Sequence, residues 1–114
     1  MILQFFVQYY SAKESILFHI VLHFAVPLVI ALVFFRSSWQ KSFFIMSATI
    51  IVDIDHLLAT PIYDPLRCSI GFHPLHTTIP IIIYALLTIN KKFRLIGIGL
   101  LVHMALDAID CYFQ

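Results

Sequence analysis

Apolar residues fill four segments of the chain, and short polar connections separate them. Their lengths are those of helices rather than strands. A helix that crosses the hydrocarbon core of a bilayer needs about 20 residues, so the middle two segments are short and are expected to thin the bilayer or to end in a wet cavity. The pattern predicts an all-α membrane protein, a four-transmembrane-helix bundle that forms a single domain over residues 1–114. The predicted spans are 15–35, 42–58, 74–90 and 93–112.

The beginning of the first helix is predicted from its flanking residues. The first ten residues, MILQFFVQYY, lack the basic region and the cleavage site of a signal peptide. Their aromatic side chains suit the headgroup boundary, so we expect a lead-in that lies at the interface. Ser11 and Glu14 have the spacing of a capping box and predict a helix start near residue 15. Pro27 falls inside this helix, and Pro74 suits the first turn of the third.

Composition supports a membrane environment. Hydrophobic residues make up 61% of the chain and charged residues 11%, against about 25% charged residues in a typical soluble domain. The mean hydropathy is +0.97. A soluble fold of 114 residues with so few charges would have too little polar surface to cover itself. The net charge of +1 offers no basic surface for nucleic acid, so membrane lipid is the expected surrounding.

Basic residues predict the orientation. Loops on the cytoplasmic side of membrane proteins carry an excess of Lys and Arg. Five basic residues lie between spans one and two and between spans three and four, and two lie on the other side. This distribution predicts that both termini and the 59–73 connection are non-cytoplasmic. The larger set is Arg36, Lys41, Lys91, Lys92 and Arg94, and the smaller set is Lys13 and Arg67.

Ionisable residues inside the spans gather at one depth. Counted at ~1.5 Å per residue from the cytoplasmic helix ends, Asp53 and His103 lie ~15 Å deep. His23, His56 and Asp107 lie near ~20 Å by the same count. Spacings of three or four residues also put neighbours on one helix face. Such residues usually face a bundle interior or a cavity, so they are expected to converge.

This convergence predicts a metal site near the outer face. The spans contain no Lys or Arg at this depth to pair with the carboxylates. His and Asp donors suit zinc, with manganese or iron as alternatives. The candidates outnumber the ligands of one catalytic zinc, which favours two ions bridged by Asp53 or Asp107. The predicted ligands are His19, His23, Asp53, His56, His73, His76, His103 and Asp107.

Other polar residues have simpler alternatives. Asp55 points away from Asp53 on an α-helix and could orient a ligand imidazole; Asp55 or Asp110 could also take a proton from water. Asp110 could equally be solvated at the helix end. The histidines of the first span could instead bond between helices. Cys68 and Cys111 both belong to the outer side, and they form either a disulfide or two separate thiols.

Three motifs carry a family resemblance: DIDH at 53–56, HPLH at 73–76 and HMALD at 103–107. After a histidine in the first span, they resemble the membrane-bound metal-dependent hydrolases of the YdjM type. The run from DIDH to HPLH is more similar to a short bacterial family, DUF6122. The resemblance covers residues 19–110 and implies a bacterial inner-membrane protein whose site includes these motifs. HPLH lacks the Arg-Gly of the larger family's middle motif.

The expected activity is hydrolysis of a lipid or lipid-linked ester or phosphoester by metal-activated water. One alternative is a di-iron lipid oxidase or hydroxylase, which iron with a redox-sensitive visible spectrum would mark. Another is a non-enzymatic metal-binding or transport protein. Transport predicts ligands that continue toward the cytoplasm, where the spans offer only residues such as Ser47 and Thr49. Four short spans enclose little volume, which is compatible with a homodimer.

Overall fold

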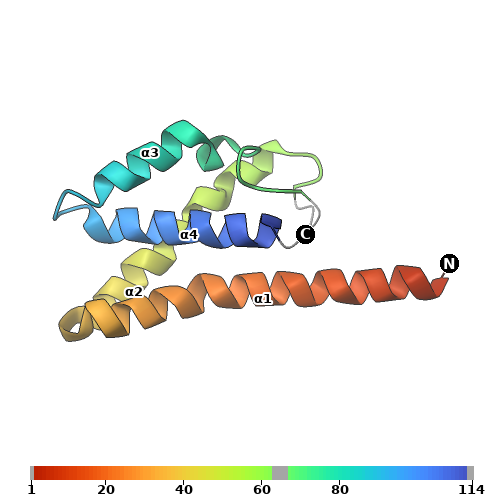
Figure 1. Ribbon diagram of the computed structural model, residues 1–114, viewed down its shortest axis with the longest axis horizontal. Helices are drawn as coiled ribbons and strands as arrows, with labels where there is room; N and C mark the ends of the chain where they lie inside the picture. The colour runs from red at the N-terminus through yellow and green to blue at the C-terminus, as the bar shows by residue number, and fades with distance from the viewer. Residues whose placement is uncertain (1, 63–66, 113–114) are drawn as a thin grey trace.

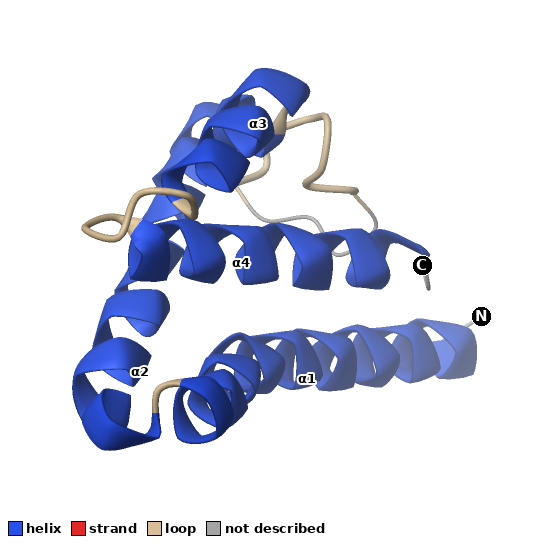
Figure 2. Ribbon diagram, turned by 60° about the vertical axis from the view of Figure 1, so that its left-hand side comes forward, coloured by secondary structure: helices blue, strands red, loops and turns tan. Residues whose placement is uncertain are grey.

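The computed structural model describes residues 2–62 and 67–112, with the side chains of residues 5–16 left out of the description. All regular structure in these ranges is helical (Figure 2). The predicted all-α class is therefore confirmed for the described part of the chain. The elements are α1 (Ile2–Phe34), η1 (Arg36–Ser38), α2 (Trp39–Ala48), η2 (Thr49–Leu58), η3 (Pro74–His76), α3 (Thr78–Leu87) and α4 (Arg94–Tyr112), where η denotes a 3-10 helix.

Helix α4 is the central element. It contacts α1, α2, η2 and α3, with α1 and α3 on opposite sides of it (Figure 1). Helices α1 and α4 run antiparallel, and α2 with η2 crosses obliquely from the end of α1 past α4 (Figure 1). The turns α1–α2 and α3–α4 lie at one end of the molecule, and the 67–73 connection lies at the other (Figure 1).

Helix α1 begins earlier than the sequence predicts. It is continuous from Ile2 to Phe34, so the prediction that a capping box at Ser11 and Glu14 starts a helix near residue 15 is wrong. Between Ile2 and these residues the chain contains no Gly or Pro that would end a helix. Pro27 lies inside the helix and is buried, and the helix continues past it.

The second predicted span consists of two helices with different periods. Helix α2 ends at Ala48, and the Thr49 hydroxyl donates to the carbonyl oxygen of Met46 at 2.5 Å. The chain then continues as the 3-10 helix η2, which has about three residues per turn. Thr49, Val52 and Asp55 therefore share one face, and all three are buried. A 3-10 helix of 10 residues is unusually long.

The third predicted span is also divided. Pro74 occupies the first turn of η3, as predicted, but Thr77 is extended and separates η3 from α3. Helix α3 then has only 10 residues. A Cys68–Cys111 disulfide, with Cα atoms 5.0 Å apart, joins the connection before η3 to the end of α4. Of the two alternatives for these cysteines, the structure has the bridge.

Two glycines allow α4 to lie close to its neighbours. A Cβ atom on Gly99 would lie 2.9 Å from the Cα atom of Met46, and one on Gly97 would lie 2.8 Å from the backbone nitrogen of Thr88. Both distances are too short for a side chain, so α4 packs against α2 and α3 by backbone contact. Leu100 and Met104 continue this face into the apolar core.

Two helical segments are long and apolar enough to cross a membrane: Leu17–Phe34 and Arg94–Tyr112. Only 17% of the first and 39% of the second is buried, whereas the core helix of a soluble protein would be mostly buried. These segments suggest a membrane protein. Helix α3 is apolar but shorter, so the count of four full spans is not confirmed.

Candidate metal centre

Four donor atoms converge beside α4 from three parts of the chain. We name Asp53, His76, His103 and Asp107 the central group; they lie on η2, η3 and α4. The Nε2 atom of His103 is 3.0 Å from Asp53 Oδ1 and 3.2 Å from Asp107 Oδ2. The Nε2 atom of His76 is 3.2 Å and 3.1 Å from the same two oxygens. The two nitrogens are 3.4 Å apart.

These separations fit a tetrahedral ion. Four donors at about 2.0–2.1 Å from a zinc ion lie about 3.3–3.4 Å from one another in a regular tetrahedron. The five separations in the central group span 3.0 to 3.4 Å. The group therefore has the size that a single metal ion requires, with every donor of a type that zinc accepts.

The hydrogen-bond pattern in the central group also favours a cation. His76 Nδ1 is 2.9 Å from Asp55 Oδ2; since a carboxylate only accepts, Nδ1 carries a proton, and a neutral ring would present its lone pair at Nε2. Asp107 Oδ2 is buried without a hydrogen-bond partner, although both imidazole nitrogens are close to it. A divalent ion among these donors would take the place of the protons that the imidazoles otherwise share with the carboxylates.

A second group contains the two histidines of α1. We name His19, His23 and Asp107 the α1 group. Nε2 of His19 is 3.0 Å from Asp107 Oδ1, and Nε2 of His23 is 3.3 Å from the same oxygen. The Nδ1–H of His23 donates to the backbone carbonyl of His19 at 2.7 Å, which leaves its Nε2 with a lone pair. That atom is buried and has no hydrogen-bond partner.

Asp107 is therefore shared by both groups. Its Oδ2 faces the central group, and its Oδ1 faces the α1 group. Asp53 approaches the two imidazoles of the central group with Oδ1 and is absent from the α1 group. Of the two residues expected to bridge a pair of ions, the geometry favours Asp107.

A third donor group lies on the Nδ1 side of His76, where Asp55 contacts that nitrogen. Asp55, His56 and His73 form the Asp55 group. His56 Nδ1 is 3.2 Å from Asp55 Oδ1, and the rings of His56 and His73 stack with centroids 3.8 Å apart. Burial lowers the pKa of the His73 imidazole, which favours its neutral form, the form that can ligate a metal. All eight predicted ligands thus fall within the three groups.

The two predicted proton acceptors differ in their surroundings. Asp55 is buried and accepts hydrogen bonds from the Leu75 N–H and the His76 Nδ1–H, both at 2.9 Å. A carboxylate that holds the second nitrogen of a metal-ligating histidine fixes its ring and its tautomer, so the contacts favour a positioning role for Asp55. Asp110 has a side chain that is 33% exposed and lies 3.9 Å from His19 Nδ1.

We predict that Asp55→Asn weakens zinc binding about 10- to 100-fold, the usual effect of losing such a partner. The amide has the same shape, but its NH₂ would face an N–H of His56, Leu75 or His76 at a position where the carboxylate now accepts a hydrogen bond. Competition with a chelator of known zinc affinity measures the change. Asp110→Asn is the matched control and should keep the wild-type affinity. Equal affinities of Asp55→Asn and wild type would contradict a positioning role.

Backbone contacts hold the HPLH segment in place. The Tyr84 hydroxyl donates to the carbonyl of Leu75 at 2.8 Å, and the Gly71 N–H donates to the carbonyl of His76 at 3.0 Å. Gly71 has a φ of +82°, which favours glycine. Sequence reasoning did not select Tyr84 or Gly71. A hydroxyl inside an apolar helix was the available signal, since a buried hydroxyl needs a partner.

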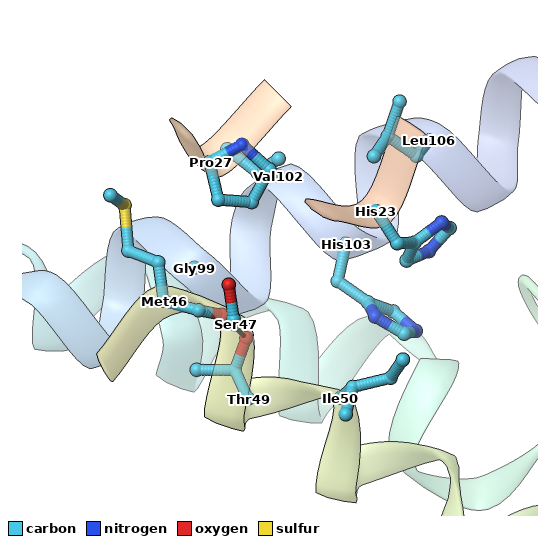
Figure 3. A pocket seen from close by; sticks show the side chains of 10 residues that line it. All are labelled: His23, Pro27, Met46, Ser47, Thr49, Ile50, Gly99, Val102, His103 and Leu106. Atoms are coloured by element: carbon cyan, nitrogen blue, oxygen red, sulfur yellow. Dashed lines mark hydrogen bonds between the residues drawn. The ribbon is translucent and has the colours of Figure 1, made fainter. Parts of the chain in front are cut away.

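A small cavity lies on the inner side of His23 and His103, between α1, α4 and the junction of α2 with η2. Its volume of about 10 Å³ corresponds to about one water molecule. The Ser47 hydroxyl, which is buried without a partner, lines it together with Thr49 (Figure 3). Beyond the two histidines, the polar side chains that line this cavity are hydroxyls, and no further metal ligand is among its lining residues. The lining residues are His23, Pro27, Met46, Ser47, Thr49, Ile50, Gly99, Val102, His103 and Leu106.

The fold and the site define an all-helical protein whose buried His and Asp clusters could hold a metal ion. Residues 14–114 match the model of the family of unknown function DUF6122, and the chain belongs to this family. No curated protein and no solved structure matches the chain. The DUF6122 part of the resemblance is confirmed, and the YdjM-type part stays a prediction.

Proposed function

We propose that this protein is a membrane-embedded, metal-dependent hydrolase of a lipid or lipid-linked ester or phosphoester. The observation that carries the proposal is the position of Asp107, which offers one oxygen to each of two donor groups. Pairs of ions about 3.5–4 Å apart are typical of phosphatases, nucleases and aminopeptidases. A carboxylate between two groups is what holds such a pair together.

The exposed surface supports a bilayer location. Large apolar side chains are exposed on every long helix, among them Phe18, Phe34, Phe44, Ile79 and Ile109, and apolar surface on this scale suits lipid better than water. We propose that α1 and α4 cross the membrane and that α2–η2 and η3–α3 form two broken spans. Breaks in a helix at membrane depth are tolerated where the backbone is buried in protein or lines a cavity.

Two features support the orientation. The exposed basic residues Arg36, Lys41, Lys91, Lys92 and Arg94 belong to one end of the molecule, which we assign to the cytoplasm. The Cys68–Cys111 disulfide is at the other end, and disulfides persist in oxidising compartments. We propose a bacterial inner membrane in which both termini and the metal centre face the non-cytoplasmic side, where lipid headgroups would be within reach.

The chain's own residues position the reactants. The hydrogen bond from His76 Nδ1 to Asp55 holds that ring with Nε2 toward the shared space, and Nε2 of His103 faces the same space. Asp107 lies between the two groups. A bound divalent ion lowers the pKa of water to about 7 and so supplies a nucleophile at neutral pH. Hydrolysis adds the hydroxyl of water to the acyl carbon or phosphorus, breaks the bond to the alcohol, and leaves a proton on the alcohol oxygen. A carboxylate outside the donor set can carry that proton.

The donor set favours zinc, since imidazole and carboxylate donors at tetrahedral spacing suit it, with manganese or iron as alternatives. Elemental analysis of the protein purified in mild detergent should find two ions per chain. A third ion would fill the Asp55 group, whose His56 and His73 are also predicted ligands. Iron with a redox-sensitive visible spectrum would replace the hydrolase with the oxidase alternative.

A substrate screen tests the activity. Vesicles that contain the protein and a panel of phospholipids should release phosphate, headgroup or fatty acid. Chelation should abolish the release, and added zinc should restore it. The same vesicles without protein are the control. Metal-loaded protein that hydrolyses no member of the panel would count against hydrolysis and favour a non-enzymatic metal-binding role.

A further inference from the structure

We infer that the two groups that share Asp107 hold unequal ions: a structural ion in the central group and an accessible, reactive ion in the α1 group. This inference rests on the proposed function and assigns the reaction to one part of the site. It depends on the number of donors, on their exposure and on the elements that each group joins.

The number of donors differs between the groups. The central group supplies four, which is the full coordination of a structural zinc site. The α1 group supplies three: the two imidazoles of His19 and His23 and one oxygen of Asp107. Catalytic zinc sites have three protein donors and keep a fourth position for water or substrate. By this criterion the α1 group has the open position.

Exposure of the imidazole donors differs between the two groups. The side chain of His76 is 0% exposed and that of His103 is 3% exposed, whereas that of His19 is 23% exposed. The side chain of Asp53 is 35% exposed, but the oxygen that it gives to the central group lies between two imidazole nitrogens, at 3.0 and 3.2 Å. His19 is thus the most exposed imidazole of the two groups, and we assign the approach of water and substrate to its side of the α1 group.

A second carboxylate lies at this exposed side. Asp110 follows Asp107 by three residues, so both carboxylates are on one face of α4. Asp110 lies 3.9 Å from His19 Nδ1 and belongs to none of the three donor groups. At 3.9 Å this carboxylate makes no hydrogen bond to the imidazole, unlike Asp55 at 2.9 Å from His76, and its side chain is 33% exposed. If an ion were bound at the α1 group, Asp110 could take a proton from water there, and we assign it that catalytic role in preference to Asp55.

The elements joined by each group explain why one ion is structural. The central group ties η2, η3 and α4 together, three elements that lie far apart in the sequence. The α1 group joins only α1 and α4, which also pack along their lengths. Loss of the central ion should therefore loosen the fold, and loss of the α1 ion should leave it intact.

Zinc titration of the metal-free, full-length protein in detergent tests the inference, with calorimetry and thermal unfolding as readouts. The wild type should bind two zinc ions in a tight and a weaker step. His19→Ala should lose only the weaker step and keep the rise in unfolding temperature that zinc produces. Asp53→Asn, which keeps the shape of the side chain, should weaken the tight step more than about 100-fold and lose that rise. Ser42→Ala, a buried change outside all groups, should match the wild type.

Activity then separates this inference from the proposed function. Asp110→Asn should keep both zinc ions and lower turnover about 10²- to 10⁴-fold, the usual contribution of a general base, with a changed pH–rate profile. His19→Ala protein that loses the tight step, or keeps full hydrolysis with one ion, would overturn the inference and leave the hydrolase standing. Wild type with the expected two steps but no hydrolysis would overturn the function and keep the unequal sites. Wild type without zinc binding would overturn both.

Discussion

Asp107→Asn is expected to reduce the metal content from two ions per chain to none. The carboxylate gives one oxygen to each group, whereas an amide offers a single neutral oxygen and turns a donor NH₂ toward the other group. Losing an outer partner alone usually costs about 10- to 100-fold in affinity, so losing this shared ligand should exceed 100-fold at both groups. Elemental analysis after gel filtration without added metal measures the loss.

The control for Asp107→Asn lies on the same helix. Asp110→Asn removes the charge of a side chain that lies three residues after Asp107 and outside the donor groups. This variant should keep both ions. Circular dichroism should show the same helix content in both variants, since asparagine has nearly the shape of aspartate. An Asp107→Asn protein that retains two ions would contradict the shared position, and one that retains a single ion would show that only one group depends on this carboxylate.

Breaking the disulfide should have the second large effect. Cys68 and Cys111 are 43 residues apart in the sequence, and closing a loop of this length stabilises a fold by about 4 kcal/mol in the chain-entropy model. Cys68→Ser should therefore unfold at a clearly lower temperature in detergent. Reductant should lower the unfolding temperature of the wild type to that of the variant and leave the unfolding temperature of the variant unchanged. Equal stability of Cys68→Ser and the oxidised wild type would contradict this prediction.

The same cysteines report the orientation. After reduction, a maleimide that cannot cross membranes should label them in intact spheroplasts as well as in lysed ones. Cys68→Ser combined with Cys111→Ser is the unlabelled control, because the chain has only two cysteines. Labelling that requires lysis would reverse the orientation and place the metal centre toward the cytoplasm.

Much of the site could be predicted because the depth of a residue along a helix and the helix face that it occupies follow from its position in the sequence. His19 and His23 share a face of α1, and His103 and Asp107 share a face of α4, through their spacing of four residues. The HPLH segment could be assigned to the same side of the bundle by its place after the second span. These features rest on a regular helix rise, which the sequence alone predicts.

The local geometry of the middle segments could not be predicted in the same way. A regular α-helix was expected through residues 42–58, but the chain tightens at Thr49 into a 3-10 helix. The change of period places Asp55 on the buried face, where it meets His76. At this junction Gly99 of α4 lies close to Met46 and Thr49, a contact between elements far apart in the sequence.

The sequence by itself determined the all-helical class, the apolar segments and the set of His and Asp residues that meet, because hydrophobic patterning and helical spacing are local properties. Only the tertiary structure decided that α1 begins at Ile2, that Cys68 and Cys111 are bonded, and that Asp107 rather than Asp53 faces two groups. Each of these depends on how helices pack and which side-chain atoms then face one another, and packing at this scale arises from contacts between distant residues.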